Sequence, residues 1–336
     1  MIINYLEELQ SMTANGSHEL GRDLDFQDNN CYQNLANKTL WTTGNGWTGA
    51  ANGSPFTGQF DGKGFKIKNL YINNNTSVKK ALFIGVGSTG AGMDGVVRNL
   101  HLVSADLSGN VSGITTTSNS WQSGANTIIE DCSFDGNLNL GSYAQCGGIV
   151  GFATSRAITV RRCKATGNMS GTGAHCGAIG GEMTGNLIFE DCYSEMTGIG
   201  YTGYGGGMVG CAGPGNMGVI PTLRQMWTNK VIGGRLICTI DYSGVNRFDN
   251  FFDSTTTGIA SQVGATARTT AQMMQLLTFT NWNIVTKAAF SPASPATWFI
   301  DEGIDYPRLW WEYTKDEPLP ETKRRSSSAV TLLMMM

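Results

Sequence analysis

The sequence predicts an all-β fold, a right-handed parallel β-helix in which each coil takes about 30 residues. Three observations predict it: a short apolar phrase at nearly constant spacing, a glycine-rich phrase after each copy, and a low content of charge. The first phrase occurs as KIKNLYI, VVRNLHL, TIIEDCSF, ITVRRCKA and LIFEDCYS. Its fourth core position falls, in steps of 30, 32, 31 and 29 residues, at Leu70, Leu100, Cys132, Cys163 and Cys192. Periods of about 20 to 50 residues are typical of solenoids, in which each unit stacks on its neighbours.

Within the first phrase, apolar and charged positions alternate as they do in a strand with one buried face. The inward column is Ile67, Val97, Ile129, Val160 and Phe189. The outward columns are Lys68, Arg98, Glu130, Arg161 and Glu190, then Asn69, Asn99, Asp131, Arg162 and Asp191. Adjacent coils lie about 4.8 Å apart, and opposite charges on neighbouring strands contribute about 0.2–1 kcal/mol per pair. We therefore interpret these carboxylates as an outer ladder that fixes the register of the coils, and not as catalytic acids.

The second phrase carries glycines in phase with apolar residues. Its copies are CGGIVGF, CGAIGGE and YGGGMVG, with weaker copies at Ala81 to Val86 and Ser112 to Thr115. Glycine is needed where φ is positive or where two backbones approach closely, so we expect Gly148, Gly177 and Gly207 at equivalent corners. The residues expected to stack inside the coils are Ile149, Ile179 and Met208. The 45 glycines and 15% charged residues fit short strands joined by tight corners.

These phrases, together with FTGQFDGKGFKIKNL at Phe56 to Leu70, resemble the GLUG-motif family. The opening from Tyr5 and the ending at Asp305 to Leu309 are similar to that family as well, so the likeness runs from about residue 2 to 312. GLUG repeats are found in bacterial surface proteins, in some secreted peptidase precursors and in phage proteins. The resemblance implies a β-helix at a surface and implies no reaction.

Four regions are expected along the chain. Residues 1–55 form an N-terminal cap with one amphipathic helix and an Asn- and Trp-rich loop at Leu35 to Ala51. Residues 56–245 form the coils. Residues 246–313 form a closing region, with a short helix at Thr269 to Leu277 and with Trp282, Trp298, Trp310 and Trp311 covering the last coil. Residues 314–336 form an extended tail.

The cysteines indicate a buried thiol ladder and no cofactor is predicted. Cys132, Cys163 and Cys192 share one inward phase, Cys146 and Cys176 share another, and there is no C-x-x-C pair. We expect the thiols to be reduced and free of metal. Asp23, Asp25 and Asp28 lack the glycine and terminal glutamate of an EF-hand, which favours cap carboxylates at a turn. The histidines are isolated in the sequence and are expected at the surface: His18, His101 and His175.

A glycan-degrading activity would need two carboxylates at a suitable distance. The candidates outside the ladder are Asp135, Glu182 and Glu195. Glu182 breaks the repeat, because Phe152 and Cys211 occupy its place in the sister coils. No paired constellation is visible, so the sequence favours a non-catalytic protein.

The global composition limits the setting. No stretch approaches eighteen apolar residues, and a net charge of −3 without a basic stripe argues against nucleic-acid binding. The family pattern begins two residues after Met1, so no signal peptide is expected. We therefore predict a structural or attachment protein on the surface of a phage virion, made in the host cytoplasm, with a head-decoration, head-fibre or tail-associated role. The alternatives are a bacterial cell-surface adhesin with GLUG repeats and, in a different class, a glycan-degrading tailspike depolymerase. A homo-oligomer is expected, with a trimer as one candidate form.

The tail is the predicted docking arm for other virion proteins of the capsid or tail. Its prolines stiffen the segment, its cations suit an acidic partner surface, and its methionines suit an irregular apolar groove. A host-surface glycan or protein is a further candidate partner. The predicted docking residues are Lys323, Arg324, Arg325, Val330, Leu332, Leu333, Met334, Met335 and Met336.

Overall fold

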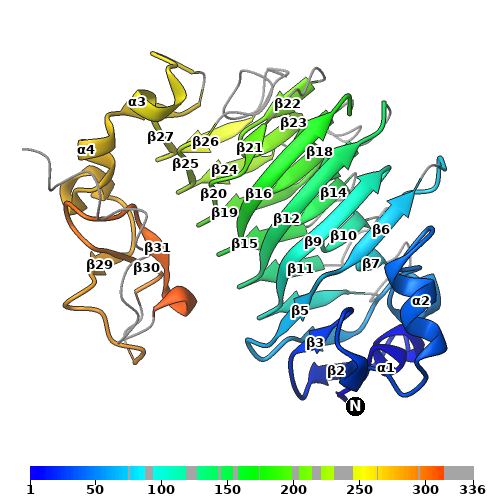
Figure 1. Cartoon of the computed structure of the whole chain (residues 1–336). Helices are drawn as coiled ribbons and strands as arrows, with labels where there is room; N and C mark the ends of the chain where they lie inside the picture. The colour runs from blue at the N-terminus through cyan, green and yellow to red at the C-terminus, as the bar shows by residue number, and fades with distance from the viewer. Residues whose placement is uncertain are drawn as a thin grey trace, which may run out of the picture.

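The computed structural model confirms a parallel β-solenoid (Figure 1). The structure describes residues 1–74, 76–87, 94–118, 127–142, 145–153, 158–173, 175–198, 204–213, 221–230, 245–262, 264–293 and 296–313. Strand pairing is parallel throughout the coils. Val97, Ile129, Val160 and Phe189 pair in register, as the phrase spacing predicts.

Two long sheets form most of the solenoid wall. The nine-stranded sheet contains, in spatial order, β1 (Ile2–Ile3), β2 (Ser17–Leu20), β4 (Gln59–Asp61), β8 (Val96–Arg98), β11 (Thr127–Glu130), β15 (Ile158–Arg161), β19 (Leu187–Glu190), β24 (Thr222–Arg224) and β26 (Asn246–Phe248). The eleven-stranded sheet contains β3 (Leu24–Asp25), β5 (Lys66–Lys68), β9 (His101–Gly109), β12 (Ser133–Leu140), β16 (Lys164–Gly171), β20 (Tyr193–Ser194), β25 (Trp227–Thr228), β27 (Phe251–Asp253) and β28 (Thr266–Arg268), with β6 (Tyr71–Asn74) on β9 and β21 (Thr197–Gly198) on β16.

Two shorter sheets close the coils. One contains β7 (Phe83–Gly85), β10 (Thr115–Ser118), β14 (Val150–Ala153), β18 (Gly180–Thr184) and β23 (Val209–Gly213). The other contains β13 (Gln145–Gly147), β17 (His175–Gly177) and β22 (Tyr204–Gly206). The apolar columns of all four sheets meet inside the solenoid and form one continuous core.

The first phrase is out of register with the other four. Lys66–Lys68 pairs with His101–Val103 in the eleven-stranded sheet, and the true counterpart of Val96–Arg98 is Gln59–Asp61. The prediction was wrong because Asn69 and Asn99 have the same local conformation, with φ of 57° and 51°, but lie at different places in the coil. Lys68 therefore does not belong to the charged column that contains Arg98.

The glycine phrase is aligned correctly at its apolar position and shifted at its start. The N–H of Ile149 donates to the carbonyl of Ile179, and that of Ile179 to Met208, which confirms the predicted stack. Gly177, however, pairs with Gly147 and Gly206, so the expected equivalence of Gly148, Gly177 and Gly207 is wrong. Tyr204 likewise pairs with His175 and not with Cys176.

Close approach, and not positive φ, explains the glycines of this phrase. A Cβ on Gly148 would lie 2.7 Å from the carbonyl oxygen of Ala178, and one on Gly177 would lie 2.4 Å from that of Gly180. Neither glycine is among the residues with positive φ. Adjacent coils could not pack at this corner around a larger side chain.

The N-terminal region contributes both a cap and the first strands of the two long sheets. Helix α1 (Leu6–Ser11) buries Leu6 and Leu9 against the end of the solenoid. The expected loop at Leu35 to Ala51 contains a second helix, α2 (Ala36–Thr42), because Trp41 packs edge-on against Trp47 at 5.0 Å. Two short 3-10 turns, η1 (Asn29–Cys31) and η2 (Ala51–Gly53), complete this region.

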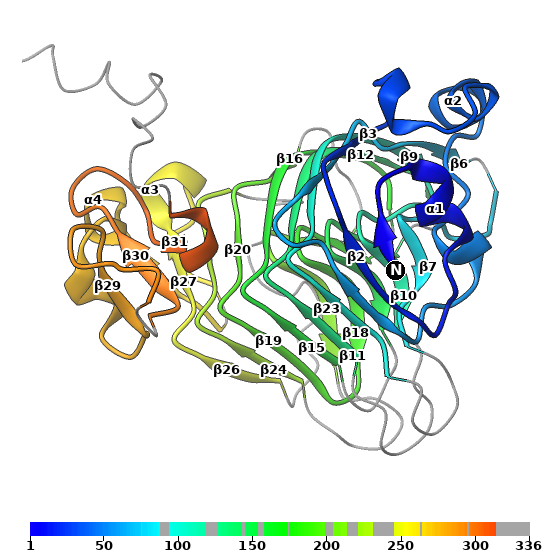
Figure 2. The ribbon, with the colours of Figure 1, turned by 90° about the horizontal axis from the view of Figure 1, so that it is seen from below.

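The C-terminal region lies at the end of the solenoid and along its side (Figure 2). Its elements are α3 (Ser254–Thr257), α4 (Thr270–Met273), η3 (Leu276–Phe279), β29 (Ile284–Thr286), β30 (Trp298–Ile300), β31 (Arg308–Leu309) and η4 (Trp310–Glu312). Helix α4 confirms the predicted helix, and its Thr269 cap bonds the Gln272 N–H. The boundaries predicted at residues 55, 245 and 313 stay predictions.

Of the four tryptophans expected to cover the last coil, Trp282 contacts its side at Phe251 and Asp249. The other three donate hydrogen bonds to earlier coils. Ile259, Ala265 and Ala267 are partly buried and pack against the solenoid core. Trp282 and Trp298 join a second apolar cluster on the outer side of the eleven-stranded sheet, where Tyr193, Trp227 and Phe251 point outward. Tyr193 stacks on Trp227 with ring centroids 4.7 Å apart and rings nearly parallel. This outward aromatic column draws the C-terminal region to the side of the solenoid.

Candidate functional site

The predicted docking residues lie outside the described residues. These are Lys323, Arg324, Arg325, Val330, Leu332, Leu333, Met334, Met335 and Met336. The candidate sites considered below are therefore built from side chains on the coils and on the C-terminal region.

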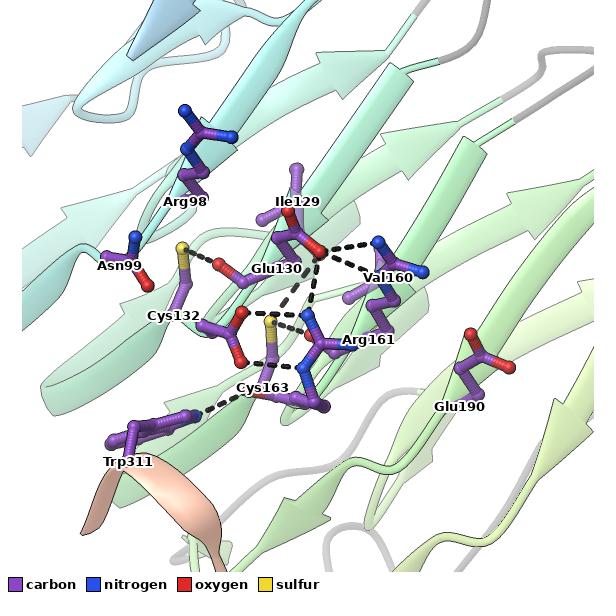
Figure 3. Close-up of polar contacts among 12 residues, drawn as sticks. Arg98, Asn99, Ile129, Glu130, Cys132, Val160, Arg161, Cys163, Glu190 and Trp311 are labelled. Carbon is purple, nitrogen blue, oxygen red and sulfur yellow. Dashed lines mark hydrogen bonds and ion pairs between the residues drawn. The ribbon is translucent and has the colours of Figure 1, made fainter. Parts of the chain in front are cut away.

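The charge ladder on the nine-stranded sheet is present and runs further than predicted. In register it reads Glu19, Asp61, Arg98, Glu130, Arg161, Glu190 and Arg224. Arg161 Nε lies 2.7 Å from Glu130 Oε2 (Figure 3). Arg98 Nε lies 3.2 Å from Asp61 Oδ2. Arg224 pairs with Glu190. Burial acts to raise the pKa of Glu130, but Arg161 and Arg162 outweigh it and hold that pKa below its ordinary value.

The second predicted charged column is a corner and not a strand position. It consists of Asn99, Asp131, Arg162, Asp191, Gln225 and Asp249, each with φ between 51° and 54°. Asn and Asp tolerate this left-handed conformation, whereas arginine is uncommon there. Arg162 is held by a two-point contact to Asp131, at 2.7 Å and 2.8 Å, and by Glu130 at 2.7 Å. The column supplies the first of the two residues that join the two long sheets in each coil.

The C-terminal region contacts this corner column at several coils along the solenoid. Trp310 Nε1 donates to Asp131 Oδ1 at 3.0 Å, and Trp298 Nε1 donates to Asp191 Oδ1 at 2.8 Å. Trp311 Nε1 donates to the Arg162 carbonyl at 3.1 Å, and Trp282 to that of Asp249 at 3.0 Å. We call this set of contacts the tryptophan strap.

Buried charges fasten the strap to the eleven-stranded sheet. Arg308 contacts Glu195 at 2.6 Å and Asp305 at 3.0 Å, and Lys164 contacts Glu312 at 2.6 Å. Glu195, one of the three candidate acids, is therefore committed to a structural ion pair. Removal of one partner from such a buried pair is costly because the other charge stays desolvated.

Two of the histidines that the sequence predicted at the surface are covered by other residues. His101 points outward from its coil, but Trp311 covers it with ring centroids 4.7 Å apart, and His101 Nδ1 lies 3.0 Å from Ser133 Oγ. Burial lowers the pKa of His101 to about 4. His18 is buried beside Thr13. The sequence could not reveal either contact. Trp311 is distant from His101 in the sequence, and Thr13 reaches His18 only because the chain between them folds back.

Glu182 lies in a polar row that the sequence did not reveal. Its Oε2 is 2.6 Å from His175 Nδ1 and also accepts a hydrogen bond from Gln145 Nε2. Gln145 Oε1 in turn accepts a hydrogen bond from Lys79 Nζ. Lys79 Nζ lies 4.0 Å from the centroid of the Phe152 ring. Glu182 pairs with Phe152 and Cys211 on neighbouring strands, as predicted. The sequence signal that could have revealed this row is that Gln145 and His175 occupy equivalent outward positions on neighbouring strands.

The three candidate carboxylates do not form one site. Asp135, on β12, accepts a bond from Thr166 at 2.8 Å, and Glu195 follows β20 in the same sheet. Glu182 lies on β18, in a different sheet. Glu182 therefore lies apart from the other two candidates.

Two of the three N-terminal aspartates, Asp25 and Asp28, behave as cap carboxylates, as predicted, whereas Asp23 pairs across strands. Asp28 accepts the Asn30 N–H at 2.9 Å, and Asp25 accepts that of Gln27 at 2.8 Å. Asp23 pairs with Lys68 at 2.7 Å.

The cysteine ladder is buried as predicted. Cys132, Cys163 and Cys192 have no exposed surface, and the thiol of Cys132 lies 3.1 Å from the carbonyl of Glu130. Within the described ranges, no group of three or more His, Cys, Asp or Glu residues is placed to hold a metal ion. The reduced, metal-free state stays a prediction.

A shallow hollow of about 380 Å³ lies on the outer side of the nine-stranded sheet. Its lining is mostly uncharged and polar, with Asn15, Ser17, Thr57, Gly58, Gln59, Asp94, Val96 and Ile128. In the part of the chain that the structure describes, no helix is long and apolar enough to cross a bilayer.

Comparison with known proteins places this chain among parallel β-solenoids. A crystal structure from Bacteroides ovatus, described as a "putative immunoglobulin A1 protease", has a similar fold, with a TM-score of 0.53 and 16% identity over 90% of this chain and 88% of that one. A stretch of 119 residues, 32% of this chain, is 33% identical to halomucin from Haloquadratum walsbyi and spans 1% of that protein's length. No family model matches the chain, so the GLUG resemblance stays a prediction. Neither similar protein comes from a phage.

Proposed function

We propose that this chain is a non-catalytic structural or attachment module of a cell-surface or extracellular protein. The observation that carries the proposal is the likeness of about a third of the chain to halomucin, together with a solenoid fold that resembles a bacterial protein over most of its length. Both similarities favour the surface adhesin over the virion protein of the sequence prediction.

The ion pairs and hydrogen bonds of the carboxylates support a non-catalytic role. Ladder carboxylates and Glu195 are paired with arginines, and Asp135 and Glu182 are hydrogen-bonded on different sheets. Such paired groups stabilise the register of a rod. An elongated solenoid presents a large surface per residue for attachment.

The test is to locate the protein in the cells that encode it. Intact cells are treated with a biotin reagent that does not cross membranes, and the full chain is recovered and compared with a cytosolic marker. We expect labelling without loss of cell integrity. Recovery in purified phage particles, without surface label, would favour the virion role instead. Retention in the cytosol with neither surface label nor recovery in particles would contradict both.

A second measurement addresses catalysis directly. The purified chain is incubated with a panel of neutral and uronic-acid polysaccharides, and new reducing ends and unsaturated ends are measured. No release above that of a heat-denatured sample is expected. Release that disappears in Glu182→Gln would establish the depolymerase alternative.

A further inference from the structure

The outer side of the nine-stranded sheet is the long face of the solenoid that the C-terminal region leaves uncovered. In Figure 2 the strands β11, β15, β19 and β24 lie side by side, and no labelled helix or strand lies over their outer side. Two columns of side chains point outward there. One is the charge ladder, and the other, two residues earlier, is Gln59, Val96, Ile128, Thr159, Ile188 and Thr222.

Half of the second column is aliphatic, which the fold itself does not need. Val96, Ile128 and Ile188 are only partly buried, although their outward positions could carry any polar residue. On the covered sheet, outward apolar residues are present where another element packs on them, as at Tyr193 and Trp227. An aliphatic stripe beside a ladder of charges therefore indicates a surface that packs against something.

The order of charges makes this face complementary to itself. From β4 to β24 the ladder reads Asp61, Arg98, Glu130, Arg161, Glu190 and Arg224, with six charges that alternate in sign. A two-fold axis parallel to the strands, between β11 and β15, reverses this order in the second copy. Glu130 then faces Arg161 of the copy, Arg98 faces Glu190, and Asp61 faces Arg224.

The same two-fold axis places residues of the second column opposite each other in the two copies. Val96 of one copy faces Ile188 of the other, and Ile128 faces Thr159. The hollow beside Val96 and Ile128 gives room for these side chains. The arginines are the outermost groups, with 36–48% of their side-chain surface exposed against 12–16% for the acids. They can therefore reach across to the acids of a second copy.

We infer that this face binds a second copy of the chain in an antiparallel, two-fold dimer. The six strands span about 24 Å along the solenoid axis, so the contact is smaller than the roughly 800 Å² per partner of a standard interface. The dimer is therefore weak and is weakened further by salt, because it depends on charges near solvent. The inference does not depend on the proposed function.

The test measures self-association of the full chain by sedimentation velocity up to about 1 mM, the range of weak interfaces. Thr159→Arg places a bulky charge at the centre of the face and should raise the dissociation constant at least about tenfold, or about 1.4 kcal/mol. Asn168→Arg, on the exposed outer side of the other long sheet, is the matched control and should leave it unchanged.

A charge pair distinguishes the antiparallel arrangement from any other. Val96→Lys and Ile188→Glu should each weaken the dimer, and the double variant should restore it, because Lys and Glu then meet across the interface. Within one chain these positions are three strands apart, about 14 Å, so they do not pair internally. A monomer at all concentrations, an unchanged dimer in Thr159→Arg, or a double variant no better than the singles would overturn the inference.

Discussion

Protonation of His101 should release part of the C-terminal region from the solenoid. The ring lies under Trp311, and its pKa is lowered to about 4 by burial, with the nearby Lys164 acting in the same direction. The folded state therefore prefers the neutral ring. Stability is unaffected by this group above pH 6.5, falls as the pH drops from 6.5 to about 4, and is constant below that.

The magnitude follows from the two pKa values. Between the ordinary 6.5 and about 4 lie about 2.5 pH units, which at 1.36 kcal/mol each correspond to about 3.4 kcal/mol of unfolding free energy. This is an upper value, because the strap can open locally and hydrate the ring without global unfolding. Local opening would appear as earlier exposure of the tryptophan strap.

The assay compares the wild type with His101→Gln by urea unfolding at several pH values between 7 and 4. All other titratable groups are the same in the two proteins, so the difference in slope isolates His101. We expect the wild type to lose about 2–3 kcal/mol more than the variant over this range. Parallel pH profiles for the two proteins would refute the reasoning.

Four further predictions follow from the contacts. Gly148→Val should cost more than the roughly 1 kcal/mol of an ordinary glycine change, because its Cβ would meet the Ala178 carbonyl at 2.7 Å, whereas Gly141→Ala, with its nearest atom at 3.7 Å, should be nearly neutral in thermal unfolding. Arg308→Met should destabilise by about 3–5 kcal/mol in chemical unfolding, because it removes the cation from Glu195 and Asp305, and adding Glu195→Gln should recover part of that loss. Metal analysis and thiol titration before and after anaerobic unfolding should show metal-free, protected thiols at Cys132, Cys163 and Cys192, and stoichiometric zinc would contradict the ladder interpretation. Deletion of residues 314–336 should leave the melting temperature nearly unchanged while abolishing attachment, and full attachment by the truncated chain would show that the tail is not the docking arm.

The repeat predicted the solenoid because column residues are direct neighbours in space. Val97, Ile129, Val160 and Phe189 form one inward column both in the sequence register and in the structure. The first copy failed for a local reason, since Asn69 and Asn99 share a left-handed conformation at different corners. Similar sequence motifs can therefore form similar turns at positions that are not equivalent in their coils.

The position of the C-terminal region could not be predicted from periodicity. Its contacts join residues more than a hundred positions apart, as between Trp298 and Asp191. A signal was nonetheless present, because Tyr193, Trp227 and Phe251 stand in the outward column where His101, Ser133 and Lys164 stand in earlier coils. Large aromatic residues on an outward column indicate that something covers it.

The tryptophan strap has a consequence for how the protein unfolds. A solenoid is nearly one-dimensional, so its coils can fray from either end almost independently. The strap bonds successive coils from Asp131 to Asp249 to one segment, so we expect those coils to exchange their amide hydrogens together, as one cooperative unit. The coils before Asn99 have the N-terminal cap but no such strap in the described contacts, and we expect them to open separately from the strapped coils.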